Sequence, residues 1–240
     1  LEEIEYRKEA ERKKDEFISI ASHELKTPLT SVKGYVQILE RSIDKGDIPT
    51  VKKHLSKVIT QVDKLSALIA DLLDISKIES GKLKFNKQYF RIDDTVNNII
   101  EVMQQSHPHF KIIQNGEAKL EVYGDEMRIE QVIVNFITNA IKYSPGTDEI
   151  QVTVYTCGDR FFLAVKDFGI GMSKKDQESV FNKFYRVEET SHRFQGLGIG
   201  LYICEQIIKR HNGTIGVKSK LGEGSEFYFY IPIHPVNDIN

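Results

Sequence analysis

Two long stretches of this sequence repeat apolar residues at alternating spacings of three and four, as helices do when they bury a seam against each other. The first seam consists of Ile18, Ala21, Leu25, Pro28, Val32, Tyr35 and Leu39. The second seam consists of Val51, Leu55, Val58, Val62, Leu65, Ile69 and Leu72. Between them, Gly46 can take the positive φ of a turn, and Pro49 suits the first turn of a new helix. The pattern predicts an antiparallel helical hairpin.

This hairpin has more apolar surface than one pair of helices can cover, because further apolar residues widen both stripes. They are Ile38, Ile59, Leu68, Leu73 and Ile75. Two copies would bury this surplus in a four-helix bundle, so we predict a homodimer. Residues 1–16 are mostly charged but keep the helical register, and we interpret them as a coiled-coil segment leading into the hairpin.

His23 lies within the first helix but outside its apolar seam, on the face expected to meet water. Glu24 follows it directly, and Thr27 lies one turn further on the exposed face. A neutral imidazole is a nucleophile near neutral pH, and a neighbouring carboxylate could accept its proton. Pro28 cannot donate a backbone bond to the carbonyl of Glu24, so we expect a bend beneath His23. An exposed histidine without a function is the competing interpretation.

Composition excludes several classes of protein. The 240 residues carry 33 basic and 35 acidic side chains, and this balance does not favour nucleic-acid binding. No apolar run approaches the roughly 20 residues that span a bilayer. Cys157 and Cys204 have no CxxC spacing and are predicted to be buried, free thiols in a reducing, cytoplasmic compartment. Because the chain begins with Leu1, we expect a fragment of a longer protein, and the cytoplasmic portion of a membrane-anchored sensor is one candidate.

The apolar period changes from helical to alternating around residues 80–81, which predicts a boundary between domains 1–80 and 81–240. Strands are expected over 83–90, 111–113, 119–122, 149–156, 161–166, 214–219 and 226–233. Helices are expected over 93–105, 125–142 and 199–210. This alternation predicts an α+β fold in which the hairpin precedes an α/β sandwich with one mixed sheet covered by helices on one face.

Asn135 and Asn139 lie four residues apart on one face of a predicted helix. Their amide oxygens are hard ligands suited to Mg²⁺, although buried asparagines also serve as structural hydrogen-bonding groups. One turn later, Lys142 could offer a cation to phosphate and Tyr143 a ring to a base. This helix therefore predicts either a metal and nucleotide site or a structural polar cluster.

Asp167 ends a predicted strand and is followed by Gly169 and Gly171. A carboxylate only accepts hydrogen bonds, so it could recognise an exocyclic amino group such as that of adenine. The glycines would let the backbone approach a ligand closely, although a simple turn is the alternative. Further on, Gly196, Gly198 and Gly200 open a helix whose free amides suit phosphate. The intervening charged segment, with Phe181 and Phe184, is expected to form a mobile lid.

Five segments of the chain, in this order, resemble the sensor histidine kinases of two-component signalling. SHELKTPL resembles the H box of that family, NFITNAIKYSP the N box, DFGIGM and GLGIGL the two glycine boxes, and FNKFYR the F box. The resemblance covers nearly the whole chain. It implies a dimerisation and phosphoacceptor hairpin followed by a Bergerat-type (GHKL) ATP-binding domain.

The resemblance also implies roles for single residues. His23 would be autophosphorylated by ATP, Glu24 would act as general base, and Thr27 would orient water when the protein dephosphorylates its partner. Asn139 would hold Mg²⁺ with help from Asn135. Nucleotide contacts would come from Lys142 at phosphate, Tyr143 near adenine, Asp167 at its amino group, Arg186 at the γ-phosphate, and Gly169, Gly171, Gly196, Gly198 and Gly200 around the lid.

The resemblance also implies a partner, the receiver domain of a response regulator, whose aspartate takes the phosphoryl group. An upstream sensor domain would be missing from this fragment.

Two alternative functions remain. A plain ATPase would release phosphate without labelling histidine, but hydrolysing relatives of this fold carry glutamate where this chain has Asn135. A non-enzymatic dimerisation module would bind no nucleotide.

Overall fold

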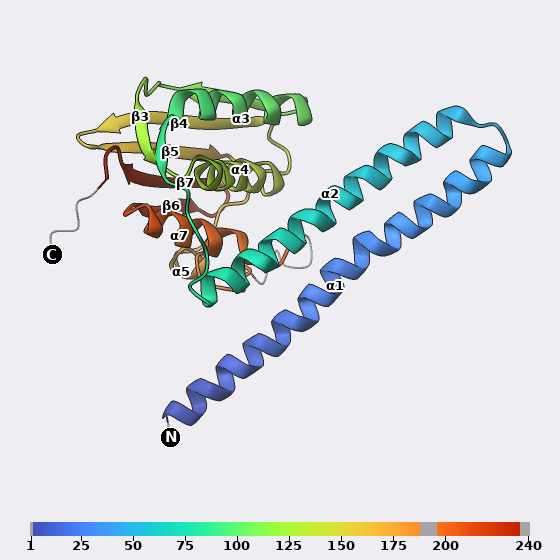
Figure 1. The fold of residues 1–240 in the computed structure, drawn as a ribbon, viewed down its shortest axis with the longest axis horizontal. Helices are drawn as coiled ribbons and strands as arrows, with labels where there is room; N and C mark the ends of the chain where they lie inside the picture. The colour runs from blue at the N-terminus through green and yellow to red at the C-terminus, as the bar shows by residue number, and fades with distance from the viewer. Residues whose placement is uncertain (1, 188–195, 236–240) are drawn as a thin grey trace. The chain divides into compact units, whose positions relative to one another are not determined.

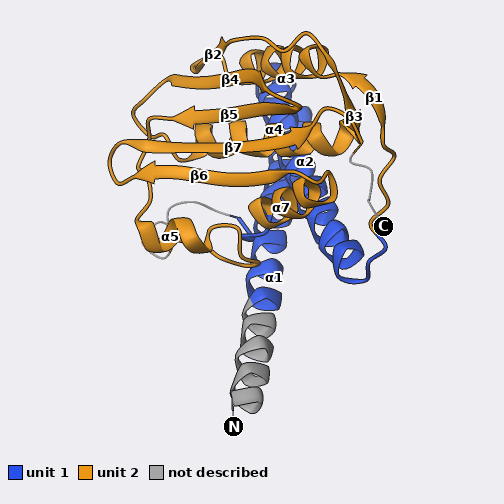
Figure 2. Cartoon of the chain, turned by 90° about the vertical axis from the view of Figure 1, so that its left-hand side faces the viewer, with its two compact units in different colours: residues 1–82, 195–199 blue, residues 83–194, 200–240 orange. Residues whose placement is uncertain are grey.

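The computed structural model describes residues 2–187 and 196–235, and within the first helix it describes side chains from residue 17 onward. The chain divides into two compact units (Figure 2). One unit contains residues 1–82 and 195–199, and the other contains residues 83–194 and 200–240. Each unit is a separate structural body with its own packing.

The first unit is built on an antiparallel hairpin of α1 (Glu2–Asp44) and α2 (Ile48–Glu79) (Figure 1). Gly46 takes a φ of 67° in the turn, and the carboxylate of Asp47 caps α2 by accepting the amide of Thr50 at 3.2 Å. The predicted hairpin and its turn are confirmed. Helix α1 is continuous through the proline in its interior.

The hairpin leaves many large apolar side chains exposed to water. Leu29 is 58 % exposed and Leu73 is 54 % exposed. The same holds for Ile18, Ile43, Leu55, Ile59, Val62 and Ile69. Because burial stabilises apolar surface by about 25 cal/mol per Å², these stripes favour association with a further apolar surface.

The second unit contains seven strands and four helices among the described residues. The strands are β1 (Gln88–Arg91), β2 (Lys111–Asn115), β3 (Glu121–Gly124), β4 (Glu149–Cys157), β5 (Arg160–Asp167), β6 (Thr214–Lys220) and β7 (Gly224–Pro232). The helices are α3 (Ile92–Ser106), α4 (Glu126–Lys142), α5 (Lys174–Ser179) and α7 (Gly200–Arg210).

Five strands form one mixed sheet in the order β2-β4-β5-β7-β6. Strands β2 and β4 run parallel, and the other neighbours run antiparallel. Figure 2 shows α3, α4 and α7 together behind this sheet. The core between them includes the fully buried Phe136 of α4, Phe161 of β5 and Phe229 of β7. The predicted sandwich with helices on one face is confirmed.

Two expectations about this unit were wrong in detail. The strand predicted over residues 83–90 is paired only over β1, and β1 pairs with β3 in a separate two-stranded sheet. The preceding residues bind other groups instead of a strand. The amide of Asn86 donates to the carboxylate of Asp125 at 2.7 Å, and the Lys87 ammonium donates to the carbonyl of Arg210. Cys157 was predicted to be buried but is exposed, whereas Cys204 is buried as expected. In addition, the short helix α5 was not predicted.

His211 connects the end of α7 to the start of α4. Its Nδ1 lies 2.8 Å from the carbonyl oxygen of Ile207, and its Nε2 accepts the backbone amide of Asp125 at 2.9 Å. Since Nε2 accepts a hydrogen bond, the buried ring is neutral with its proton on Nδ1. Burial lowers the pKa of His211, although the bond to Ile207 acts in the opposite direction.

We expect the second unit to lose stability as the pH falls below about 6.5, where an unfolded histidine takes up a proton that folded His211 resists. Urea unfolding followed by circular dichroism at about pH 7.5 and about pH 5.5 measures this change. His211→Gln should weaken the unit by about 1–3 kcal/mol at the higher pH and reduce its pH dependence. His109→Gln, at an exposed loop position, is the matched control. A pH dependence of His211→Gln equal to wild type would contradict this assignment.

No helix in the described ranges combines the length and the hydropathy needed to cross a bilayer.

Candidate functional site

Helix α4 brings Asn135 and Asn139 together on one face. The amide nitrogen of Asn139 donates to Oδ1 of Asn135 at 2.9 Å, so the second side chain is oriented by the first. This bond leaves Oδ1 of Asn139 as an acceptor for another group. A Cβ placed on Gly200 would lie 2.4 Å from Nδ2 of Asn135, so glycine at the start of α7 leaves the Asn135 amide in this position.

Lys142 and Tyr143 close the same helix. The amide of Tyr143 donates to the carbonyl of Asn139 at 2.9 Å, and the Lys142 ammonium lies 4.8 Å from the centroid of the Tyr143 ring. Burial raises the pKa of Tyr143, and the positive charge of Arg186 lowers it in part. Arg186, more than 40 residues away in the sequence, therefore lies close to the end of α4.

Asp167 ends β5 with its side chain turned into the protein. The residue is only 3 % exposed, and its Oδ1 accepts the amides of Gly169 at 2.9 Å and Ser225 at 3.2 Å. Burial raises the pKa of Asp167, while these two amide bonds favour the charged form. The Ser144 hydroxyl also favours the charged form of Asp167. Both amides bind Oδ1, and each carboxylate oxygen accepts more than one hydrogen bond, so Oδ2 keeps the capacity to accept from a ligand.

The loop after Asp167 is held between two other backbone segments. Added Cβ atoms at Gly169 and Gly171 would each lie 2.0 Å from a carbonyl oxygen, that of Tyr143 and that of Lys220 respectively. The amide of Ile170 also donates to the Tyr143 carbonyl at 3.1 Å. The two glycines are therefore required for the loop to pass between the end of α4 and the β6–β7 turn.

The segment FNKFYR is anchored to the core by an aromatic contact. The ring of Phe181 lies 6.3 Å edge-on from Phe227 of β7, which itself lies 5.6 Å from Phe136 of α4. Phe184 takes a φ of 66°, which is uncommon for a residue with a bulky side chain. Residues 188–195 of the predicted lid lie outside the described residues.

Gly196 and Gly198 both take positive φ, 145° and 67°, which explains why glycine stands at these positions. Leu197 between them is buried. The structure thus gives a conformational reason for the glycines of this segment, whereas contact with phosphate stays a prediction.

The hairpin presents its predicted site residues in different environments. His23 is exposed, as predicted, and Thr27 is half-buried with its hydroxyl donating to the carbonyl of His23 at 3.0 Å. Glu24 is only 8 % exposed, on the side of α1 that also carries the buried Ala21. Since consecutive helical residues are about 100° apart, Glu24 lies beside the exposed face of His23 and not on it.

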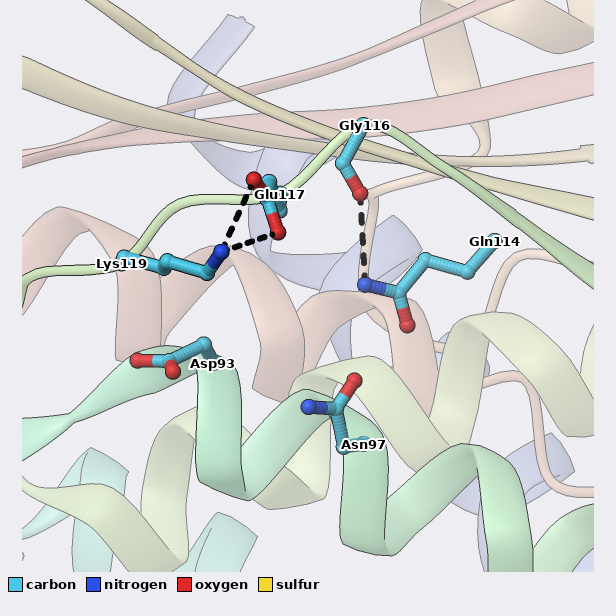
Figure 3. Close-up of a pocket in the computed structure, with 6 residues that line it drawn as sticks. All are labelled: Asp93, Asn97, Gln114, Gly116, Glu117 and Lys119. Atoms are coloured by element: carbon cyan, nitrogen blue, oxygen red, sulfur yellow. Dashed lines mark hydrogen bonds and ion pairs between the residues drawn. The ribbon is translucent and has the colours of Figure 1, made fainter.

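A pocket of about 420 Å³ elsewhere in the second unit contains none of the predicted site residues. Figure 3 shows it between α3 and the segment after β2, lined by Asp93, Asn97, Gln114, Gly116, Glu117 and Lys119. Its only lining cation, Lys119, is paired with Glu117 at 2.9 Å. The lining therefore does not suit a phosphate. In the part of the chain that the structure describes, no three His, Cys, Asp or Glu side chains cluster as metal ligands.

Two family models match the chain. The His Kinase A (phospho-acceptor) domain matches residues 13–81, which cover the hairpin. The family of histidine kinase-, DNA gyrase B- and HSP90-like ATPases matches residues 124–235, which include α4, the loop after β5 and α7.

Individual relatives agree with these matches. The sensor histidine kinase WalK of Bacillus subtilis is 33 % identical over 228 residues, covering 92 % of this chain and 37 % of the relative. The sensor protein SrrB of Staphylococcus aureus strain N315 is 33 % identical over 223 residues, covering 91 % of this chain and 38 % of the relative. The chain thus spans less than two fifths of the length of either relative.

Among solved structures, the histidine kinase AdeS of Acinetobacter baumannii superimposes with a TM-score of 0.64 at 26 % identity, covering 88 % of this chain and 98 % of that structure. The fold, the order of the two matched domains and the relatives agree. The chain belongs to the sensor histidine kinases of two-component systems.

Proposed function

We propose that this chain is the dimerisation and catalytic portion of a sensor histidine kinase, which transfers the γ-phosphoryl group of ATP to His23. The observation that carries the proposal is the buried Asp167, which keeps one carboxylate oxygen available beside a glycine loop, in an ATPase-family unit. The exposed His23, in a phosphoacceptor-type hairpin of the same chain, supplies the nucleophile.

We assign residues 1–80 to the dimerisation and phosphoacceptor domain, with 1–16 as its coiled-coil lead, and residues 81–240 to the ATP domain. The exposed apolar stripes of the hairpin support a homodimer, because a second hairpin would cover them in a four-helix bundle. The longer length of the relatives supports an upstream sensor domain outside this chain.

In the ATP domain, Oδ2 of Asp167 accepts a hydrogen bond from the adenine amino group. The half-buried ring of Tyr143 stacks near the base. Lys142 and Arg186, which both lie close to Tyr143, bring positive charge to the phosphates. The glycines at 169, 171, 196, 198 and 200 shape the backbone around the nucleotide.

Asn139 fits a magnesium ion, because its bond to Asn135 fixes the amide plane and leaves a hard oxygen acceptor. When bound, magnesium neutralises charge on the phosphates of ATP. Asn135 acts in this assignment by orienting Asn139. Its own amide occupies the position where a water-activating glutamate would favour hydrolysis, so transfer to histidine is the favoured outcome.

The transfer is an in-line displacement. A neutral ring nitrogen of His23 attacks the γ-phosphorus, the bond from that phosphorus to the bridging oxygen breaks, and ADP leaves with the electron pair. Glu24 takes the proton from the other ring nitrogen. The phosphoryl group then passes from His23 to an aspartate of a response-regulator receiver, and Thr27 orients water when the same hairpin dephosphorylates that receiver.

Glu24→Gln is expected to slow autophosphorylation by about a hundredfold, because the amide cannot accept the ring proton. ATP affinity should stay unchanged, since Glu24 lies on the hairpin. Glu40→Gln, at an exposed position of the same helix, is the control. Single-turnover labelling measures the rate, and an unchanged rate would remove Glu24 as the base.

The proposed function is tested by incubating the purified chain with γ-labelled ATP and Mg²⁺. We expect protein-bound label that is lost in acid and stable in alkali, with little free phosphate released before a receiver is added. Phosphate release with each turnover and no protein label would instead identify an ATPase. Absence of nucleotide binding in a calorimetric titration would identify a dimerisation module.

A further inference from the structure

The side chain of Gln177 in α5 pairs with the backbone of one residue at the β6 edge of the five-stranded sheet. Strand β6 is an edge strand, and α5 lies beside it (Figure 2). The backbone amide of Ser219 in β6 donates to Oε1 of Gln177 at 3.1 Å, and Nε2 of Gln177 donates to the carbonyl of Ser219 at 3.0 Å. This pair of bonds reproduces what a neighbouring strand would provide.

The same amide also reaches the end of the loop that follows Asp167. Nε2 of Gln177 lies 3.3 Å from the carbonyl oxygens of both Met172 and Ser173. The amide of Met172 donates to the hydroxyl of Ser219 at 2.8 Å. Gln177 and Ser219 together therefore fix where this loop ends.

A continuous chain of hydrogen bonds leads from Ser219 back to Asp167. The Ser219 hydroxyl has one proton, which it donates to the carbonyl of Gly224 at 2.8 Å. The hydroxyl of Ser225, 2.9 Å away, must then donate to Ser219. The amide of Ser225 donates to Oδ1 of Asp167. The carboxylate assigned to adenine is thus connected to Gln177 through two serines.

The residue next to Gln177 connects α5 to the FNKFYR segment. Oδ1 of Asp176 accepts the hydroxyl of Tyr185 at 2.7 Å, and its other oxygen accepts from Ser173 in a capping box that starts α5. These bonds lower the pKa of Asp176 despite the opposing effect of burial. Within α5, Gln177 therefore binds the end of the Asp167 loop, and the preceding residue, Asp176, binds the FNKFYR segment.

We propose that Gln177 is a positioning residue that joins the adenine loop to the FNKFYR segment, so that both are placed as one unit when ATP binds. The inference rests on the proposed function, because it needs Asp167 to bind adenine. It assigns to α5, which carries no recognised motif, the task of setting the position of Tyr185 relative to Asp167. The effect on ATP is indirect, since Gln177 acts through Ser219 and Asp176.

Gln177→Ala in the full chain is expected to lower the autophosphorylation rate at saturating ATP by about tenfold and to weaken ATP affinity by about threefold. The alanine side chain cannot bind the backbone amide and carbonyl of Ser219 or the carbonyl of Met172. Tyr185→Phe removes only the hydrogen bond from Tyr185 to Asp176. It should therefore lower the autophosphorylation rate and leave ATP affinity within about twofold of wild type. Glu178→Ala, at an exposed position of the same helix, should match wild type in both measurements.

Gln177→Glu gives a chemical signature that loss of packing would not produce. Its carboxylate would face three carbonyl oxygens at about pH 8, and these oxygens raise its pKa above the usual value of about 4.3. At about pH 5.5 the acid form is therefore populated, and it can again both donate and accept. Relative to wild type at the same pH, ATP affinity of this variant should recover on acidification. The affinity of Gln177→Ala should not recover.

Each outcome decides the proposal. Values for Gln177→Ala within about twofold of wild type, with a native circular dichroism spectrum, would overturn it. If that variant does not fold, Gln177→Glu decides, and absence of recovery at low pH would overturn the proposal. Asp167→Asn, measured in parallel, separates failure of the adenine assignment from failure of the role proposed for Gln177. Unchanged affinity there refutes the adenine assignment, whereas lost affinity there with a normal Gln177→Ala refutes only the role of Gln177.

Discussion

Replacement of His23 by alanine is expected to abolish acid-labile phosphorylation completely while ATP binding is retained. The side chain is exposed, so its removal opens no cavity, and alanine is a strong helix former that preserves α1. All residues assigned to ATP binding lie within residues 124–235, which match the ATPase family and are outside the hairpin. Incubation with γ-labelled ATP followed by acid and alkali treatment measures the label, and calorimetry measures ATP binding.

His109→Ala is the control for this experiment, because it removes an exposed histidine that has no predicted role. It should be labelled like wild type. Acid-labile label that persists in His23→Ala would mean that another residue accepts the phosphoryl group. If neither wild type nor variant is labelled although ATP binds, the plain ATPase becomes the better hypothesis.

Asp167→Asn is expected to weaken ATP binding by about a hundredfold, corresponding to about 2.7 kcal/mol for loss of a buried charged acceptor. The asparagine oxygen can still accept the amides of Gly169 and Ser225, so the loop should keep its conformation. The new NH₂ group would meet the amino group of adenine, donor against donor. Calorimetric titration with ATP measures the loss.

The same substitution should change base selectivity. Guanine presents a carbonyl where adenine presents its amino group, so Asp167→Asn should narrow the preference for ATP over GTP. Asp159→Asn, at the exposed β4–β5 turn, should bind ATP like wild type. ATP affinity of Asp167→Asn within about threefold of wild type would contradict the assignment.

The long helices and the central strands could be predicted from sequence because their apolar periods extend over many residues. The seams of α1 and α2, the buried alternation of Ile150, Val152 and Val154 in β4, and the turn at Gly46 all left clear patterns. The strand predicted over 83–90 was too long, because the alternating apolar residues before Gln88 pack against the protein without forming a paired strand. The backbone amide of Asn86 binds the carboxylate of Asp125, and pairing with β3 starts only at Gln88.

The site was only partly predictable. Asn135, Asn139 and Asp167 were recognised because their spacing or their position after a strand suggests chemistry. Helix α5 has six residues, which is too few for a helical period to be visible. Gln177 and Ser219 are 42 residues apart, and no local spacing connects a side-chain amide to a strand edge.

Burial of Glu24 was missed for a related reason. The helical wheel placed the seam at the expected spacings, but a seam wider than two positions per heptad also encloses its neighbours. Glu24 follows the exposed His23 by one residue and is nevertheless buried. A wheel drawn from sequence does not fix how far around the helix the contact extends.

The amide of Gln177 also affects how copies of this chain can meet. Exposed strand edges invite pairing with strands of other molecules, which leads to aggregation. At Ser219 both backbone groups of the β6 edge are already occupied by a side chain of the same chain. A protein proposed to dimerise through its hairpin thus has, at Ser219, a position of the β6 edge that is closed to a second, unwanted mode of association.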